Sequence, residues 1–558
     1  MNASNAVDES GALLANGEPI ARVLQAIRTM PVTLAIAVSI SLLFTFHALG
    51  PRVDPREPPL LKPRIPFIGH IVAMMRHQAQ FHISLQRSTG RPIATLPMLT
   101  GKMYAVWDPY LIASGLRTKS LSTTPHLIDA MPRATRVSKA TVDLINSPRG
   151  LQLLDQVMLH VIPSSLKGAS LQTMTKTALA DVASQLTSLA PPSSSSPAPV
   201  VLPNAWLWIR HLLTAATTRA LYGEGNNNNP FAADPRAEPG LWELERHLLQ
   251  VTLDMPGAGG RAGRRAREEL VAALSPYYAA RRDENAASAI VRARAAACRD
   301  AGMPDDDIAR LEIMLPFAAL ANTVPLLFWL FCHVFSRPDV VERARREVEG
   351  LVVTRKGSGG EEVTLQVTTS AVEERCPLLM SCYRETQRVT VHQVCTRTAL
   401  EDTVLTDRAG RQYLLKKGGV VQMIIGTSHN MPEYWGDDVD EFKPERFLNY
   451  RDGSQKGEGS ADGPGSSRAM RAAFQPFGGG IHLCPGRHFA FSEMMAVMAT
   501  LLLGYEVEPL EGTEWKLPPF ATRSVVDAVT KPAKHGEGLG VRIKRRPGWE
   551  GVRWRYEL

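Results

Sequence analysis

A glycine-rich segment near the C-terminus, residues 477–486, constrains this chain more than any other stretch. It places Cys484 shortly after the run Gly478, Gly479 and Gly480, and glycines adopt backbone conformations that side chains forbid. The apolar residues 487–503 that follow predict a helix ending at Gly504, and a helix N-terminus favours a thiolate through its unpaired N–H groups. Cys484 is therefore either a small buried residue behind a loop or a thiolate that can bind a metal.

The spacing around Cys484 distinguishes these two interpretations. Phe477 stands seven residues before the cysteine, Gly480 four before it and Gly486 two after it. The segment thus resembles F-x-x-G-x-x-x-C-x-G, the haem-binding signature of the cytochrome P450 family. The resemblance implies a haem b cofactor with the Cys484 thiolate as axial iron ligand and Phe477 packed beside it. His482 occupies the position where the family usually has an arginine that bonds a haem propionate.

Two further motifs upstream strengthen the resemblance. Glu385 and Arg388 form a Glu-x-x-Arg motif, and residues three apart share a helix face where they can pair. Arg446 belongs to a P-E-R-F element. In the family these three side chains interlock in a buried triad behind the haem, so the resemblance implies the same here. Arg397 falls where the family often has a propionate-binding arginine; alternatively it is a surface arginine on a strand.

Residues 305–336 are predicted to form a long central helix. Three aspartates at its start suit a helix N-terminus, and residues 314–335 are apolar on all sides, which predicts burial through the middle of a domain. Pro325 cannot donate a hydrogen bond to the carbonyl one turn earlier, so we expect the helix to kink or open near Ala321.

The resemblance assigns the oxygen-side residues to this helix. The family pattern pairs an acid with a threonine that relay protons during oxygen activation. Here Thr323 is kept, Asn322 replaces the acid and Leu320 replaces a usual glycine, so proton delivery would run through Thr323 and ordered water. This Asn-Thr-x-Pro variant resembles the branch that includes sterol 7α- and 12α-hydroxylases and prostacyclin synthase. Alternatively, the polar pair only satisfies the backbone of a kinked helix.

The N-terminal region predicts membrane attachment. Residues 30–50 carry no Asp, Glu, Lys or Arg and are long enough for a transmembrane anchor. A cleaved signal peptide is the competing interpretation, which the acidic residues before this stretch disfavour. The basic residues that follow predict a lumenal tail at 1–29 and a cytoplasmic catalytic domain, anchored by a single pass in the endoplasmic reticulum membrane. Residues 51–69 resemble the proline-rich hinge of microsomal family members.

The resemblance covers the rest of the chain as one domain. We expect residues 70–558 to be mainly α, a single large cytochrome P450-type domain with small β-sheets, including a hairpin of residues 92–96 and 103–107 around Gly101. The six cysteines show no short spacing pattern, so no disulfide framework or zinc site is expected.

Net charge is +8, but no basic run with interleaved aromatic residues indicates nucleic-acid binding. The family offers another use for such charge, the electrostatic docking of an NADPH–cytochrome P450 reductase near the thiolate. Arg468, Arg471 and Arg487 are the candidate docking residues.

The resemblance implies a membrane-bound haem-thiolate monooxygenase that activates O2 with electrons from this reductase and oxidises a lipophilic small molecule. Alanine-, proline- and glycine-rich loops resemble filamentous-fungal enzymes that make terpenoid, polyketide or alkaloid secondary metabolites. Two alternatives remain open. One is a haem-thiolate isomerase or dehydratase that acts on a peroxide without a reductase, and the other is a non-catalytic membrane haem-binding protein. Retained Thr323 argues against the isomerase, and the intact Glu-x-x-Arg and P-E-R-F motifs together with Thr323 weigh against the non-catalytic protein.

Overall fold

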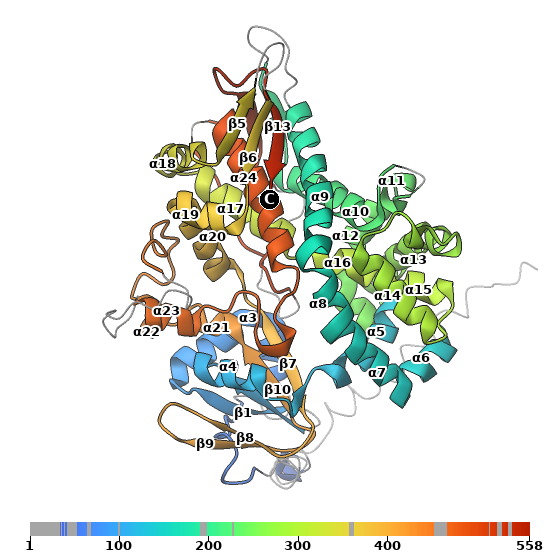
Figure 1. Ribbon diagram of the computed structural model, residues 1–558. Coiled ribbons are helices and arrows are strands. Elements are labelled where there is room, and N and C mark those ends of the chain that lie inside the picture. The colour runs from blue at the N-terminus through green and yellow to red at the C-terminus, as the bar shows by residue number, and fades with distance from the viewer. Residues whose placement is uncertain are drawn as a thin grey trace, which may run out of the picture.

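The computed structural model describes residues 53–63, 69–98, 101–189, 198–225, 228–356, 362–450, 466–512, 514–521, 527–533 and 538–558, together with residues 34, 36, 37 and 39–41. The predicted tail at 1–29, nearly all of the predicted anchor at 30–50 and part of the predicted hinge at 51–69 lie outside these residues. The described chain is a mainly helical body with small sheets gathered at its ends (Figure 1), which confirms the predicted fold class.

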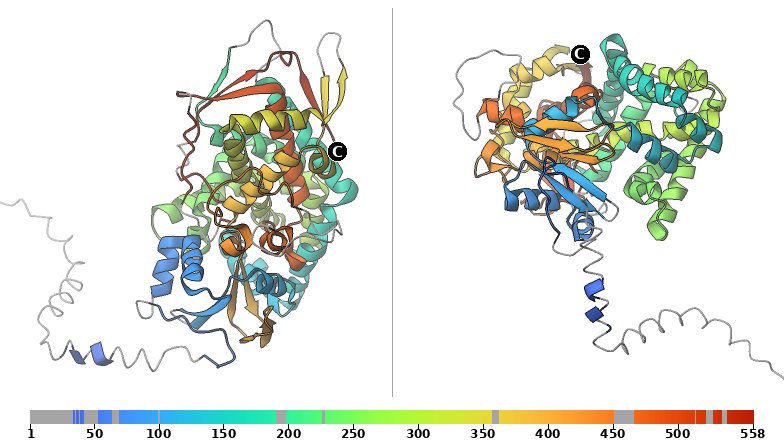
Figure 2. Two further views of the ribbon diagram at one scale, coloured as in Figure 1. Left: turned by 90° about the vertical axis from the view of Figure 1, so that its left-hand side faces the viewer. Right: turned by 90° about the horizontal axis from the view of Figure 1, so that it is seen from below.

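The largest sheet has five strands in the order β1-β2-β10-β7-β3. The predicted hairpin is its edge: β1 pairs antiparallel with β2 around Gly101, whose φ of 152° suits glycine. β10 joins β2 in parallel and β7 antiparallel, so strands far apart in the sequence lie side by side, as the blue and orange strands in Figure 2 show. The strand bounds are β1 Ile93–Met98, β2 Gly101–Val106, β3 Leu121–Ser122, β7 Val394–Ala399 and β10 Val420–Ile424.

Three smaller sheets complete the β structure, in the orders β11-β12-β4, β13-β6-β5 and β8-β9. Their bounds are β4 Val200–Leu202, β5 Val352–Lys356, β6 Glu362–Gln366, β8 Thr403–Thr406, β9 Gln412–Leu415, β11 Tyr505–Pro509, β12 Val541–Arg545 and β13 Arg553–Glu557.

The remaining regular structure of the described chain consists of helices. Their bounds are α3 Gly69–Thr89, α4 Pro109–Arg117, α5 Thr124–Thr135, α6 Lys139–Ile145, α7 Pro148–Gln156, α8 Ile162–Ser165, α9 Gly168–Leu189, α10 Ala205–Tyr222, α11 Pro230–Ala233, α12 Ala237–Thr252, α13 Ala258–Ala279, α14 Ala289–Asp300, α15 Asp305–Glu312, α16 Met314–Leu320, α17 Thr323–Phe335, α18 Pro338–Glu349, α19 Thr369–Arg375, α20 Pro377–Thr390, α21 Ile425–Ser428, α22 Pro432–Trp435, α23 Ser467–Ala473 and α24 Arg487–Gly504. The helix predicted after Cys484 is α24, and it includes Gly504 as its last residue.

The core centres on α17, where all residues from Thr323 to Phe335 are buried. This helix packs against α10, α18, α20 and α24, so elements from residue 205 to residue 504 meet around it. Within the described residues, the stretch Asp305–Phe335 is the one helix long and apolar enough to cross a membrane, and most of it is buried inside the protein. Its apolar character is therefore explained by the core.

The predicted central helix is present but is divided into α15, α16 and α17. The opening expected near Ala321 lies between α16 and α17, where Pro325 has no N–H to donate to the Ala321 carbonyl. A second break, at Ile313, was not predicted. Pro316 explains it in the same way, because it cannot donate to the carbonyl of Glu312.

Candidate active site

The loop before Cys484 owes its shape to close contact with α4. Gly478 and Gly480 have φ values of 73° and 65°, in the region that favours glycine. A Cβ atom on Gly480 would lie 2.0 Å from the carbonyl oxygen of Leu116, so no larger residue fits there. The backbone N–H of Cys484 donates to the carbonyl of Phe477 at 3.1 Å, which closes the loop. Leu116 gave no signal in the sequence because its contact is made by the backbone.

The Cys484 thiol is partly buried at the start of α24. Burial raises the pKa of Cys484, while the backbone N–H groups of Gly486 and Arg487 donate to the sulfur and oppose the rise. The N–H donors expected from the sequence are present, yet burial outweighs them. A cation bound at the sulfur would lower this pKa and favour the thiolate.

The structure brings Glu385, Arg388 and Arg446 together in one buried network. Arg388 donates from Nε and Nη2 to the two oxygens of Glu385, both at 2.8 Å, and Arg446 donates from Nε to Oε1 of Glu385 at 2.9 Å. The Glu385 and Arg388 side chains are fully buried. Such charges are tolerated in the interior only when they are paired and hydrogen-bonded, as these are.

This network reaches the cysteine loop through His429, a residue that the sequence did not single out. Arg388 donates from Nη1 to the His429 carbonyl at 3.1 Å. The backbone N–H of Gln475, two residues before Phe477, donates to the His429 ring at 3.3 Å. The Glu385 cluster therefore fixes the segment that enters the loop of Cys484.

Arg397 and His482 fit an anionic group beside that loop. Arg397 lies on β7, is 6% exposed and donates to the carbonyl of Thr396 at 3.0 Å; no carboxylate pairs with it in the described part of the chain. Burial lowers the pKa of Arg397, and burial together with the nearby charge of Arg397 lowers the pKa of His482. Arg397 and His482 thus lie within electrostatic reach of each other, and the Asp155 carboxylate acts on His482 in the opposite direction. Arg397 is buried on its strand, so the surface alternative is wrong.

The surroundings of Cys484 also fit an apolar group. Ile481 and Leu483, on either side of His482, are 59% and 40% exposed. Large apolar side chains with this exposure next to a partly buried thiol are suited to contact with a hydrophobic ligand. A thiol ligand, an apolar surface and a buried unpaired arginine are the features that a haem with its propionates requires.

The structure separates the roles of Thr323 and Asn322. Thr323 is buried, and its hydroxyl donates to the carbonyl of Ala319 at 2.8 Å, which replaces a hydrogen bond lost at the helix break. Asn322 is exposed, as is Ala318 one turn earlier, although the rest of this central segment is largely buried. These two residues mark an accessible face on the central helix. Leu320 points into the core and is fully buried.

The basic residues predicted near Cys484 have different positions. Arg487 donates from Nη1 to the carbonyl of Cys484 at 3.0 Å, so it supports the loop. Arg468 and Arg471 are exposed on α23. A hollow of about 370 Å³ opens between α4, α23 and the glycine run, and both Arg471 and Arg117 line it.

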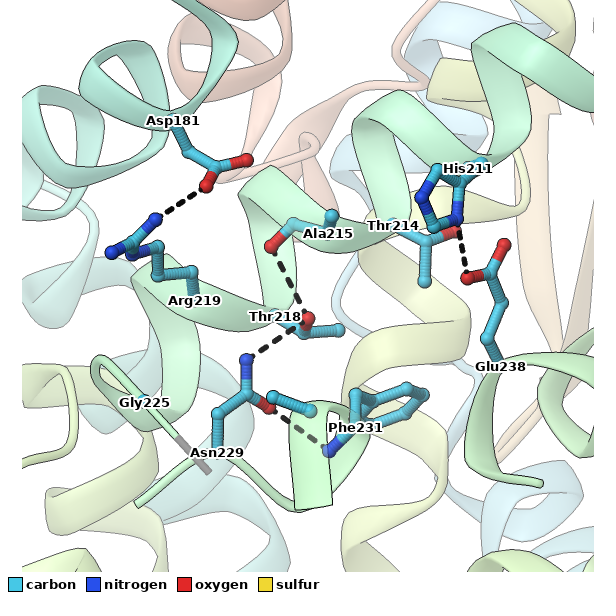
Figure 3. Close-up of a pocket in the computed structure, with 11 residues that line it drawn as sticks. Asp181, His211, Thr214, Ala215, Thr218, Arg219, Gly225, Asn229, Phe231 and Glu238 are labelled. Atoms are coloured by element: carbon cyan, nitrogen blue, oxygen red, sulfur yellow. Dashed lines mark hydrogen bonds and ion pairs between the residues drawn. The ribbon is translucent and has the colours of Figure 1, made fainter. Parts of the chain in front are cut away.

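A second pocket, of about 350 Å³, lies between α9, α10 and α12 (Figure 3). Two ion pairs face each other across it: Arg219 donates to Asp181 at 2.6 Å, and the His211 ring contacts Glu238 at 2.8 Å. The hydrogen bond to Glu238 raises the pKa of His211. None of the residues predicted from the motifs lines this pocket, and its charges are paired among themselves.

Comparison with known proteins agrees with this geometry. The family model described as Cytochrome P450 matches residues 254–535. A cytochrome P450 monooxygenase of Gibberella zeae is 36% identical over 534 residues, covering 94% of this chain and 96% of the relative. A 25-hydroxycholesterol 7-alpha-hydroxylase of Rattus norvegicus is 25% identical over 270 residues, covering 48% of this chain and 63% of the relative. The solved structure of a retinoic acid-bound cyanobacterial CYP120A1 has the same fold, with a TM-score of 0.61 at 16% identity over 88% of this chain and all of the other.

Proposed function

Because this chain belongs to the cytochrome P450 family of haem oxidoreductases, we propose that it is a haem-thiolate monooxygenase in which Cys484 holds the iron. The observation that carries the proposal is the loop of Cys484, which α4 and the Glu385 network hold in one conformation. Haem, when bound, supplies the reductive activation of O2 that inserts one oxygen atom into an organic substrate. The other roles proposed below belong to side chains of this chain.

Arg397 and His482 bind the haem propionates in this proposal. Arg397 supplies a permanent positive charge and His482 a single ring N–H. Phe477 packs beside the sulfur, while Gly480 and Gly486 let the backbone pass close to the cofactor. The buried, unpaired state of Arg397 supports this assignment, since a buried cation without an anion is otherwise unfavourable.

Asn322 and Thr323 form hydrogen bonds with water or substrate on the accessible face of the central helix. The exposed Asn322 amide can hold a water molecule or a substrate oxygen, although it cannot ionise. The Thr323 hydroxyl donates to Ala319, which leaves its oxygen lone pairs to accept from a water in the helix opening. Proton transfer then runs through water held between these two side chains.

An NADPH-dependent cytochrome P450 reductase is the proposed electron donor. The hollow beside the glycine run carries Arg117 and Arg471, with the exposed Arg468 on the same helix as Arg471. A basic surface beside the cysteine loop attracts an acidic flavin domain by electrostatic steering. The dependence of the reduction rate on ionic strength tests this docking, because screening weakens it.

The proposed substrate is a lipophilic small molecule of fungal secondary metabolism, such as a terpenoid, a polyketide or an alkaloid. Similarity to a hydroxylase named for an oxysterol supports a bulky apolar substrate, and the Gibberella zeae relative is a fungal monooxygenase. We further propose a lumenal tail at 1–29, a transmembrane anchor at 30–50, a hinge at 51–69 and a cytoplasmic catalytic domain at 70–558 on the endoplasmic reticulum membrane. Loss of membrane sedimentation after deletion of residues 1–50 tests the anchor.

The decisive experiment compares the full chain with Cys484→Ser. The wild type should give the thiolate-type Soret band when its haem is reduced under carbon monoxide, and Cys484→Ser should lose that band. With a reductase, NADPH and O2, the wild type should then convert a candidate terpenoid or polyketide into a product one oxygen atom heavier. A wild type without the thiolate-type band would overturn the haem-thiolate assignment.

A second candidate function has one observation in its favour. Because the Thr323 hydroxyl proton is engaged by the Ala319 carbonyl and Asn322 cannot ionise, proton delivery here is weaker than in an acid–threonine pair. A haem-thiolate isomerase or dehydratase that rearranges a peroxide needs no such delivery. Turnover of a hydroperoxide without reductase, NADPH or O2 would favour this alternative over the monooxygenase.

A further inference from the structure

A buried ion cluster away from Cys484 joins two distant parts of the chain. Lys531 donates to Oε1 of Glu245, and also to Oδ1 of Asp527 at 2.9 Å. Glu245 lies on α12, 286 residues before Lys531, and both residues are 7% exposed. A buried ion pair stabilises a protein little compared with apolar packing, but breaking it by removing one partner is costly. Such a pair holds its two segments in one relative position.

The segment that carries Lys531 is fixed on its other side. The backbone N–H of Thr530 donates to the carbonyl of Thr390, at the end of the helix that bears Glu385, at 2.9 Å. The indole N–H of Trp329 on α17 donates to the Thr530 carbonyl at 2.7 Å. Lys531 therefore belongs to a segment that is hydrogen-bonded to both α17 and α20.

The segment that carries Glu245 borders the accessible face of the central helix. α12 packs against α5, α13 and α16, and α16 carries the exposed Ala318, four residues before the exposed Asn322. The far end of α12 is less enclosed, since Leu249 and Leu253 are 41% and 56% exposed. The ion pair thus ties the buried middle of α12 to the fixed wall formed by α17 and α20.

We propose that Lys531 and Glu245 are positioning residues that hold α12 at a set distance from α17 and so fix the width of the substrate chamber. In this proposal the pair contacts neither substrate nor cofactor; the second oxygen of Glu245 is buried and has no hydrogen-bond partner among the described residues. This inference rests on the proposed function, because it takes the face with Asn322 as the wall of that chamber. Its consequence is selectivity for bulky apolar substrates that need both walls in place.

Two iron-binding probes of different size test the proposal in the haem-loaded full chain. Imidazole needs access only to the iron, whereas an imidazole carrying three aryl groups must contact both walls. In Glu245→Gln and Lys531→Met, binding of the bulky azole should weaken by about tenfold, corresponding to about 1.4 kcal/mol, while imidazole binding stays the same. Lys531→Arg keeps the ion pair and should bind both probes like the wild type, as should the surface control Lys139→Met.

The charge-swapped variant Glu245→Lys/Lys531→Glu, made together with Asp527→Asn, separates positioning from folding. Asp527→Asn removes the carboxylate that would otherwise lie beside the glutamate introduced at position 531. The swap then keeps one cation paired with one carboxylate, so it should recover most of the affinity for the bulky azole that the single variants lose. Unchanged binding of the bulky azole in Glu245→Gln, or a swap that binds no better than the single variants, would overturn the inference. If Lys531→Met does not fold, Glu245→Gln and the swap decide the question. A wild type that lacks the thiolate-type Soret band would instead overturn the proposed function.

Discussion

Replacing Glu493 by glutamine should change the pH dependence of stability in a defined way. Glu493 lies on α24, nine residues after Cys484, and its side chain is fully buried. Its Oε1 accepts a hydrogen bond from the Thr217 hydroxyl of α10 at 2.8 Å, and its Oε2 has no partner among the described residues. Burial raises the pKa of Glu493 from 4.5 to about 8.

The sign and size of the effect follow from this pKa. Between pH 4.5 and about 8 the unfolded chain has lost the Glu493 proton while the folded protein keeps it. The contribution of Glu493 to the free energy of unfolding therefore falls as pH rises through this window, and it is constant above and below it. The difference between the two pKa values corresponds to at most about 5 kcal/mol at the upper end of the window.

Glutamine keeps the acceptor for the Thr217 hydroxyl and does not ionise. Glu493→Gln therefore removes the fall in the free energy of unfolding that ionisation of Glu493 causes as the pH rises. The stability of Glu493→Gln relative to the wild type should increase by several kcal/mol from about pH 5 to about pH 8 and then stay level. Urea unfolding followed by tryptophan fluorescence at a series of pH values measures the free energy of unfolding of both proteins. Subtracting the wild-type value at each pH removes the contribution of the titrating groups that both proteins share. Glu374→Gln, at an exposed position on α19, is the matched control and should show a constant difference. Parallel stability curves for Glu493→Gln and the wild type would refute the reasoning.

Three further substitutions probe the site. Gly480→Ala should abolish haem retention, because its Cβ would meet the Leu116 carbonyl at 2.0 Å, whereas Gly551→Ala, where a Cβ meets nothing within 4 Å, should retain haem like the wild type. Glu385→Gln should destabilise the protein by about 3 kcal/mol or more in urea unfolding, because it leaves two buried arginine side chains without their shared anion. Thr323→Val should lower product formation per NADPH consumed by about tenfold, with Thr323→Ser close to the wild type, if that hydroxyl carries the proton path; equal coupling in both variants would contradict this role.

Much of the site could be predicted because its information is local. The glycine run, Cys484 and the helix after it are contiguous, and Glu385 and Arg388 are one helical turn apart. The opening of the central helix was predictable for the same reason, since Pro325 acts on a carbonyl one turn away. Pro316 is an equivalent local signal for the break at Ile313, because it acts on the carbonyl of Glu312 one turn away.

Other features depend on contacts that no local pattern encodes. The link from Arg388 through His429 to Gln475 joins a side chain, a carbonyl and a backbone N–H from three segments. The charge of Arg487 and its closeness to Cys484 in the sequence suggest a docking residue, yet its guanidinium donates to the Cys484 carbonyl. Likewise, nothing in the sequence near Glu245 indicates a lysine 286 residues later as its partner.

The contact between α4 and Gly480 has a consequence for electron entry. The same backbone that supports the cysteine loop also forms the wall of the hollow lined by Arg117 and Arg471. The glycine run that leads to Cys484 lines this hollow directly, so a side chain inserted there would contact that run without any intervening residue. If the reductase docks at this hollow as proposed, its contact with the glycine run would act on the segment that Leu116 holds in place before Cys484, so partner binding would also change the environment of the sulfur.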